Sequence, residues 1–95
     1  MEVFILKESQ IESYLREKIK ALGGIAYKFV SPGNSGVPDR LVLLPEGRSV
    51  FVELKAPGKK PTKLQLVQHK RMQALGHEVR VIDSREQVDA WLQEL

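Results

Sequence analysis

The sequence predicts an α/β fold in which helices flank a mixed four-stranded sheet. Helical and strand patterns alternate along the 95 residues in the order helix, three strands, helix, strand, helix. A strand that follows a helix normally returns parallel to its neighbour through a right-handed crossover. We therefore expect an α/β sandwich in which a hairpin and a parallel strand share one sheet.

Residues 9–22 are expected to form an amphipathic helix, because apolar side chains recur at every third or fourth position. Ser9 and Glu12 fit a capping box at the start of this helix, and Gly23-Gly24 is a natural stop. The following segment, 25–30, is rich in β-branched and aromatic residues and indicates the first strand.

A hairpin is expected in the middle of the chain. Residues 31–36 are rich in turn-forming types, and Pro38 then suits the start of a strand over residues 39–44. Residues 45–48 resemble a tight connection, and 49–55 returns as the partner strand.

The last third of the chain predicts a helix, a strand and a helix. Thr62 opens the first of these helices, with Gln65 as its capping-box partner, and Gly76 ends it. A short strand at 78–82 and a helix at 85–94 follow. The side chains of the earlier helix that are expected to face the core are Leu64, Val67, Met72 and Leu75.

Length and composition indicate one globular domain over residues 1–95. The chain has room for a single core, and 42% hydrophobic with 28% charged residues is typical of a soluble protein. No apolar run reaches the roughly 20 residues that span a bilayer. The opening segment is too short and too acidic for a signal peptide, so we expect cytoplasmic residence and no membrane contact.

Residue types that the sequence lacks limit its metal chemistry. There is no cysteine, which excludes disulfides, thiol catalysis and cysteine-ligated zinc. His69 and His77 lack the i, i+4 spacing of a helical zinc pair, and we expect both to lie on the helix surface without catalytic duty. Any metal here is therefore expected to be a hard cation held by oxygen atoms.

The hairpin brings charged residues together. If the turn is centred between Glu46 and Gly47, the numbers of cross-strand partners sum to about 93, within a boundary error of a few residues. Asp39 then lies opposite Glu53 or Leu54, and period-two alternation places Glu53 and Lys55 on one face. Such charges are costly in an otherwise apolar strand unless they are paired or bound to a cation.

These residues form a plausible Mg²⁺ site. Two adjacent carboxylates repel, so without metal at least one of their pKa values should be raised. Asp39, Glu53 and the carbonyl of Leu54 are the expected protein ligands, since magnesium commonly takes one or two carboxylates and keeps several waters. The metal would activate a water beside a phosphate, and Lys55 would orient that water or neutralise the transition state.

Each fragment alone has an ordinary structural explanation. Proline-aspartate pairs mostly start turns, and a Glu-x-Lys triplet on a strand is mostly a surface charge pair. The register of the two fragments across one hairpin favours the functional interpretation instead. A basic segment after the hairpin adds to it.

The net charge of +3 is unevenly distributed. Residues 54–77 contain no acidic side chain, so this segment suits a phosphate backbone, although a solvated helix face would explain it equally well. Ser31 and Asn34 in the preceding loop are further candidates for contact with DNA. The basic candidates for nucleic-acid binding are Lys59, Lys60, Lys63, Lys70 and Arg71.

At these positions the chain resembles the virus-type replication-repair nuclease (VRR-NUC) domain of the PD-(D/E)XK nuclease superfamily, in its stand-alone phage and bacterial form. The resemblance covers nearly the whole chain, from about residue 8 to the last residue. It implies a restriction-endonuclease-like αβββαβ(α) core. It rests on Glu12, Gly36-Val37-Pro38-Asp39-Arg40, Phe51-Val52-Glu53-Leu54-Lys55-Ala56-Pro57 and Pro61-Thr62-Lys63-Leu64-Gln65.

The resemblance also implies roles for individual residues. Asp39 and Glu53 would be metal ligands and Lys55 the catalytic lysine. Glu12 would be an accessory acid that reaches the metal directly or through water. Gln65 would position the lysine, the water or the phosphate. The implied cofactor is Mg²⁺, with Mn²⁺ as a possible substitute, and no organic cofactor is expected.

Two of these roles have competitors in the sequence. Glu8, one turn before Glu12, is the competing acid, and helix capping or solvation would also explain Glu12. Gln65 is equally a capping partner of Thr62. Gln68, nearer the middle of the expected buried stripe, is the alternative amide.

The leading hypothesis is a structure-selective endonuclease that hydrolyses DNA phosphodiester bonds in branched or Holliday-junction-like substrates during replication, repair or recombination. A homodimer is expected, because a domain this small buries only about 60–65% of its surface and symmetric branched DNA offers two equivalent cleavage points. The main alternative is a catalytically inactive nucleic-acid-binding module with the same fold. A third is a small domain whose basic segment contacts an acidic protein.

Overall fold

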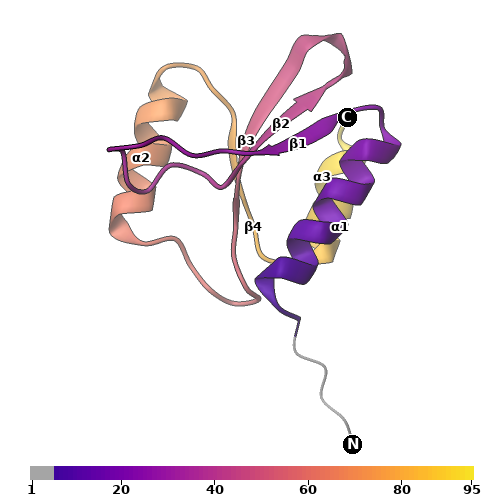
Figure 1. Cartoon of the computed structure of the whole chain (residues 1–95), viewed down its shortest axis with the longest axis horizontal. Coiled ribbons are helices and arrows are strands. Elements are labelled where there is room, and N and C mark those ends of the chain that lie inside the picture. Colours follow the sequence, from indigo (N-terminus) through magenta and orange to yellow (C-terminus); the bar gives the residue numbers. More distant parts are fainter. Residues whose placement is uncertain (1–5) are drawn as a thin grey trace, which may run out of the picture.

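The computed structural model describes residues 6–95 (Figure 1). Their elements follow the predicted order, and no helix within this stretch is long and apolar enough to traverse a bilayer. In chain order the elements are α1 (Glu8–Ala21), β1 (Ile25–Lys28), β2 (Arg40–Leu44), a 3₁₀ turn η1 (Pro45–Gly47), β3 (Arg48–Leu54), α2 (Lys63–Ala74), β4 (Val79–Ile82) and α3 (Arg85–Gln93).

The four strands form one mixed sheet in the order β1-β2-β3-β4. β1 pairs antiparallel with β2, and β2 pairs antiparallel with β3. β4 pairs parallel with β3, and α2 forms the crossover that a parallel pair requires. The predicted α/β class with a mixed four-stranded sheet is therefore confirmed.

The start of α1 differs from the prediction. The helix begins at Glu8, and the N–H of Lys7 donates to Oε1 of Gln10 at 2.8 Å. The predicted capping box of Ser9 and Glu12 is wrong, because the chain enters the helix two residues earlier. The Glu12 side chain is consequently available for a contact with the sheet.

α1 and α3 cover one face of the sheet and enclose the hydrophobic core. The hydroxyl of Tyr14 on α1 donates to both carboxylate oxygens of Asp89 on α3, at 2.7 and 2.9 Å, which joins the two helices. The buried apolar side chains are Ile11, Leu15, Ile19, Val42, Leu44, Val50, Val52, Leu54, Ile82, Val88 and Trp91.

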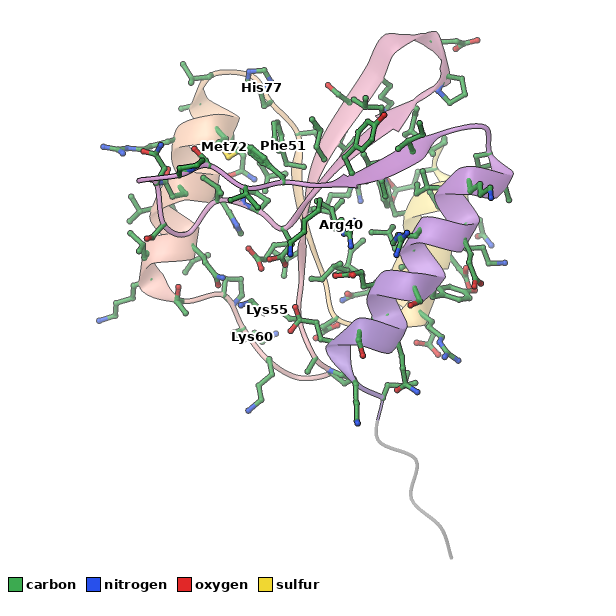
Figure 2. All side chains as sticks on the ribbon, in the orientation of Figure 1. Arg40, Phe51, Lys55, Lys60, Met72 and His77 are labelled. Carbon is green, nitrogen blue, oxygen red and sulfur yellow. The ribbon has the colours of Figure 1, made fainter. Side chains whose placement is uncertain are left out.

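α2 lies on the other side of the sheet from α1 and α3 (Figure 1). The apolar inner face predicted for it is wrong, since Leu64, Val67 and Leu75 are 51%, 50% and 78% exposed. The residue of α2 that is buried is His69. On this side Phe51 of β3 also meets the edge of the His77 ring, with ring centroids 6.1 Å apart (Figure 2).

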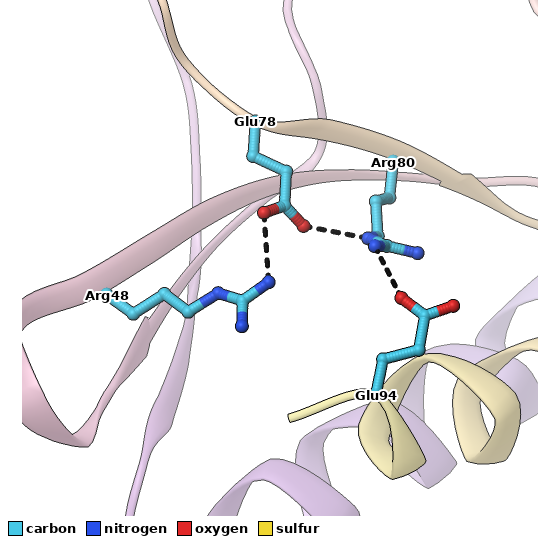
Figure 3. A network of polar contacts seen from close by, with 4 residues as sticks. All are labelled: Arg48, Glu78, Arg80 and Glu94. Atoms are coloured by element: carbon cyan, nitrogen blue, oxygen red, sulfur yellow. Dashed lines mark hydrogen bonds and ion pairs between the residues drawn. The ribbon is translucent and has the colours of Figure 1, made fainter.

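A chain of ion pairs ties the end of α3 to the sheet (Figure 3). Glu78 accepts from Arg48 at 3.1 Å and from Arg80 at 2.8 Å, and Arg80 reaches Glu94 at 2.9 Å. Burial alone would raise the pKa of Glu78, but hydrogen bonds from the two arginines outweigh it and the net pKa is lowered. The network connects β3, β4 and the C-terminal end of α3.

Candidate active site

The hairpin register brings the two predicted carboxylates to the same level of the sheet. Partner numbers in β2 and β3 sum to 92, one less than predicted, so Asp39 lies level with Glu53. The carbonyl of Asp39 accepts from the N–H of Phe29 at 2.7 Å, and its Oδ2 accepts from the N–H of Leu54 at 2.9 Å. Asp39 is thus anchored from both sides, with its side chain within hydrogen-bonding reach of Glu53.

Glu53 is a buried acid. Its side chain is 1% exposed, and burial together with hydrogen bonding and repulsion from Asp39 raises its pKa to about 8, which Lys55 only partly offsets. In the absence of a cation Glu53 therefore holds a proton at neutral pH. The predicted convergence of two carboxylates with a raised pKa is present, whereas their role as metal ligands stays a prediction.

Two nitrogen atoms face the Glu53 carboxylate. Lys55 Nζ lies 3.8 Å from Oε2, and His69 Nε2 lies 3.6 Å from Oε1. The side of the sheet on which Glu53 lies follows from the alternation of side chains along β3. Val52 and Leu54 enter the core on the α1 side, and Glu53 between them points to the α2 side.

His69 is the residue that sequence reasoning missed. The prediction of a surface histidine is wrong, since His69 is 4% exposed and packed on the sheet next to Glu53. Burial lowers its pKa, Lys55 adds to that effect and Asp39 opposes it. One signal was available: His69 follows Gln65 by one helical turn, so a helix that presents Gln65 to the site also presents His69.

Glu12 lies on the opposite side of the sheet from this cluster. Its Oε1 accepts from a terminal nitrogen of Arg40 at 2.6 Å, and Arg40 also donates to the carbonyl of Ala26 at 3.1 Å. Arg40 is buried on the α1 side, whereas its neighbour Asp39 belongs to the α2 side. The structure does not bring Glu12 to Glu53, and its accessory role stays a prediction.

Glu8 is the acid of α1 whose pKa is affected by the charges of Asp39 and Lys55. Partial burial raises its pKa, and the charge of Asp39 raises it further, while Lys55 acts in the opposite direction. Glu8 stands at the first turn of α1 and is exposed. The competing acid named from sequence is therefore coupled to Asp39.

The two candidate amides of α2 are engaged elsewhere. Gln65 Oε1 accepts from the N–H of Thr62 at 2.9 Å, and Thr62 Oγ1 accepts from the N–H of Gln65 at 3.2 Å, which confirms the predicted capping box. Gln68 donates to the carbonyl of Ser35 at 3.1 Å. Neither amide contacts the carboxylates, and the positioning role of Gln65 stays a prediction.

The loop before Asp39 packs against the start of α2. Gly36 has φ +90°, and a Cβ added there would lie 3.0 Å from the carbonyl oxygen of Leu64, so a glycine is required on both counts. Within the loop, Asn34 Nδ2 donates to Ser31 Oγ at 3.0 Å. These contacts fix the approach of the chain to Asp39, and contact of Ser31 or Asn34 with DNA stays a prediction.

The five predicted basic contacts are all exposed. None of them forms an ion pair with another residue of the described chain. Figure 2 labels Lys55 and Lys60 in the part of the view between α2 and α1. The exposed set consists of Lys59, Lys60, Lys63, Lys70 and Arg71.

The donor set fits a hard divalent cation. Asp39, Glu53 and the carbonyl of Leu54 supply oxygen atoms, and Glu53 Oε1 is buried without a hydrogen-bond partner. Within residues 6–95 no group of three or more acidic or histidine side chains is arranged to hold an ion by itself. Two carboxylates and a carbonyl are the protein share typical of Mg²⁺, which keeps several waters.

Comparisons with known proteins show relatives that resemble the chain along most of its length. No family model matches the chain. It is 57% identical over 82 residues, 86% of this chain and 88% of the relative, to "Putative nuclease p44" of Acyrthosiphon pisum secondary endosymbiont phage 1.

Solved structures extend the likeness to the fold. A structure named "VRR_NUC domain" is 40% identical with a TM-score of 0.86, and the match covers 90% of this chain and 94% of that one. A second, named "VRR_NUC domain protein", has a TM-score of 0.70 at 18% identity, covers 95% and 88% of the two chains, and shows the shared fold alone. On these likenesses across most of both chains, the protein belongs to the VRR-NUC family of nuclease domains.

Proposed function

We propose that this protein is a Mg²⁺-dependent endonuclease that hydrolyses phosphodiester bonds in DNA, with Mn²⁺ as a substitute for Mg²⁺. The observation that carries the proposal is the convergence of Asp39, Glu53 and Lys55 on one face of the sheet. Membership of a nuclease-domain family supports the same chemistry.

Each residue has a task that follows from its contacts. The hydrogen bond from Leu54 holds Oδ2 of Asp39 and leaves Oδ1 for a cation. Glu53 releases its proton when a cation replaces it as the counter-charge. Asp39, Glu53 and the carbonyl of Leu54 would hold Mg²⁺, which would lower the pKa of a coordinated water and stabilise charge on the phosphoryl oxygens. Lys55, 3.8 Å from Glu53, places a positive charge where negative charge develops on the phosphate.

Branched DNA, such as a flap or a four-way junction, is the proposed substrate. The exposed basic side chains in the segment from Lys59 to Arg71 support binding to a phosphate backbone without base-specific contacts. Roles in replication, repair or recombination and residence in the cytoplasm stay predictions. The inactive-module alternative keeps the same DNA contacts and differs by the absence of cleavage.

A homodimer is proposed as the working form. Apolar side chains at the β1 edge of the sheet support it, because Ile25, Tyr27 and Leu43 are 50%, 53% and 40% exposed, and Ile25 is the cross-strand partner of Leu43. Light scattering during size-exclusion chromatography should give twice the monomer mass. A monomer mass at micromolar concentration, retained with DNA, would remove the dimer from the proposal.

The cleavage proposal is tested with labelled single-stranded, duplex, flap and four-way DNA, each with Mg²⁺, Mn²⁺ or chelator. We expect cation-dependent cleavage, greatest for the branched substrates, that is abolished in Glu53→Ala while DNA binding is largely retained. Glu17→Gln, which changes an exposed acid of α1, is the matched control and should cleave normally. DNA binding without cleavage under every condition would favour the inactive module.

A further inference from the structure

His69 occupies a position in α2 at which an aliphatic side chain would be expected. It is the buried residue of a helix whose leucines and valine remain about half exposed. A histidine buried on a sheet surface costs free energy unless its polar atoms are bonded. Because His69 is packed against the sheet, its ring nitrogen atoms need a polar partner there.

The partner is Glu53. Both His69 Nε2 and Glu53 Oε1 are buried without a hydrogen bond to the described residues, and they lie 3.6 Å from each other. Two unpaired buried polar atoms are rare in a native protein, and here they face one another at slightly more than hydrogen-bonding distance. A shift of a few tenths of an ångström pairs both atoms at once.

We propose that His69 is a positioning residue for the cation site: its Nε2–H donates to Oε1 of Glu53 and fixes the rotation of the carboxylate that faces Asp39. An ionised carboxylate only accepts hydrogen bonds, so the imidazole carries its hydrogen on Nε2 when Glu53 is ionised. With Lys55 near Oε2 and His69 near Oε1, the carboxylate is held from two sides. Partners of this kind keep a ligating carboxylate in its binding orientation.

The role of His69 rests on the proposed cation site, so the experiment measures cation binding directly. Ca²⁺, an oxygen-seeking cation, is titrated calorimetrically into the full chain without DNA. His69→Leu keeps most of the volume and removes the donor, whereas His69→Gln places an amide N–H near the position of Nε2. We expect Ca²⁺ affinity to fall about 10-fold or more in His69→Leu and to recover largely in His69→Gln. His77→Gln, at the exposed histidine, should leave it unchanged.

A second measurement does not depend on how well the variants fold. ¹⁵N NMR of the wild-type imidazoles at saturating Ca²⁺, where Glu53 is ionised, should show His69 with its hydrogen on Nε2. The ring signals of His69 should shift between the Ca²⁺-free and Ca²⁺-saturated protein, while those of His77 do not. A hydrogen on Nδ1 in the Ca²⁺-saturated protein, or Ca²⁺ affinity unchanged in a folded His69→Leu, would overturn the positioning role and leave the nuclease proposal standing. A wild-type protein that binds no Ca²⁺, Mg²⁺ or Mn²⁺ would overturn both.

Discussion

Replacing Glu53 by glutamine removes a buried acid that the metal-free protein keeps at a cost. The folded protein holds a proton on Glu53 up to a pKa of about 8, whereas the unfolded chain releases it near the ordinary glutamate pKa of 4.5. At pH 7 that difference corresponds to roughly 3 kcal/mol of unfolding free energy. Glutamine carries no charge and has nearly the same shape. We therefore expect Glu53→Gln to be more stable than wild type at pH 7 by about 1 to 3 kcal/mol, or at least about 4 °C in melting temperature.

The sign of the pH dependence is fixed by the direction of the shift. Because the pKa of Glu53 is raised in the folded state, its contribution to stability is full below 4.5 and is lost as the pH rises through about 8. The difference between variant and wild type should grow by roughly 1 kcal/mol per pH unit across that range. Thermal and urea unfolding with chelator at pH 5, 6, 7 and 8 measures it, with Glu17→Gln as the exposed-acid control. Equal stability of Glu53→Gln and wild type at pH 8, or a stability difference between them that does not change with pH, would refute the reasoning.

Three further experiments test the roles of Glu8 and Glu12, the proton on Glu53, and the basic pair Lys59 and Lys60. Glu8→Gln should slow cleavage about 10-fold or more at unchanged melting temperature, because Glu8 is coupled electrostatically to Asp39. Glu12→Gln should mainly lower stability, by about 1 to 3 kcal/mol, because it removes the negative charge that pairs with the buried Arg40. Identical effects of the two variants on cleavage and stability would contradict these expectations. The Mg²⁺ concentration for half-maximal cleavage should fall as the pH rises from 6 to 8, because Glu53 must lose its proton, and a pH-independent value would contradict this. Lys59→Gln combined with Lys60→Gln should weaken binding to every DNA and reduce the slope of log affinity against log salt by about 2; an unchanged slope would remove both from the interface.

The arrangement of the carboxylates was predictable because β-hairpin geometry is local. A turn position and a period of two place Asp39 near Glu53 to within one residue, and the register observed differs from the prediction by that amount. The element order was predictable for the same reason, since apolar periodicity and turn residues act over a few positions. The capping box of Thr62 and Gln65 is another local pattern that the structure confirms.

The contacts made across the sheet were not predictable. Adjacent residues of a strand face opposite sides of the sheet, so Asp39 points to the α2 side and Arg40 to the α1 side. Glu12 bonds Arg40 on the α1 side and therefore does not join Asp39. The side of α2 that meets the sheet was also misjudged. The leucines and valine of α2 indicate an apolar face, but the side chain that α2 buries against the sheet is His69, next to Glu53 of β3. No pattern within the helix sequence predicts that orientation.

An anomalous difference map from crystals grown with Mn²⁺ tests the shared cation site most directly. A peak should lie about 2 Å from carboxylate oxygens of both Asp39 and Glu53, and it should be missing from crystals of Glu53→Gln. No peak at saturating Mn²⁺, or a peak that touches neither carboxylate, would contradict a cation held between β2 and β3.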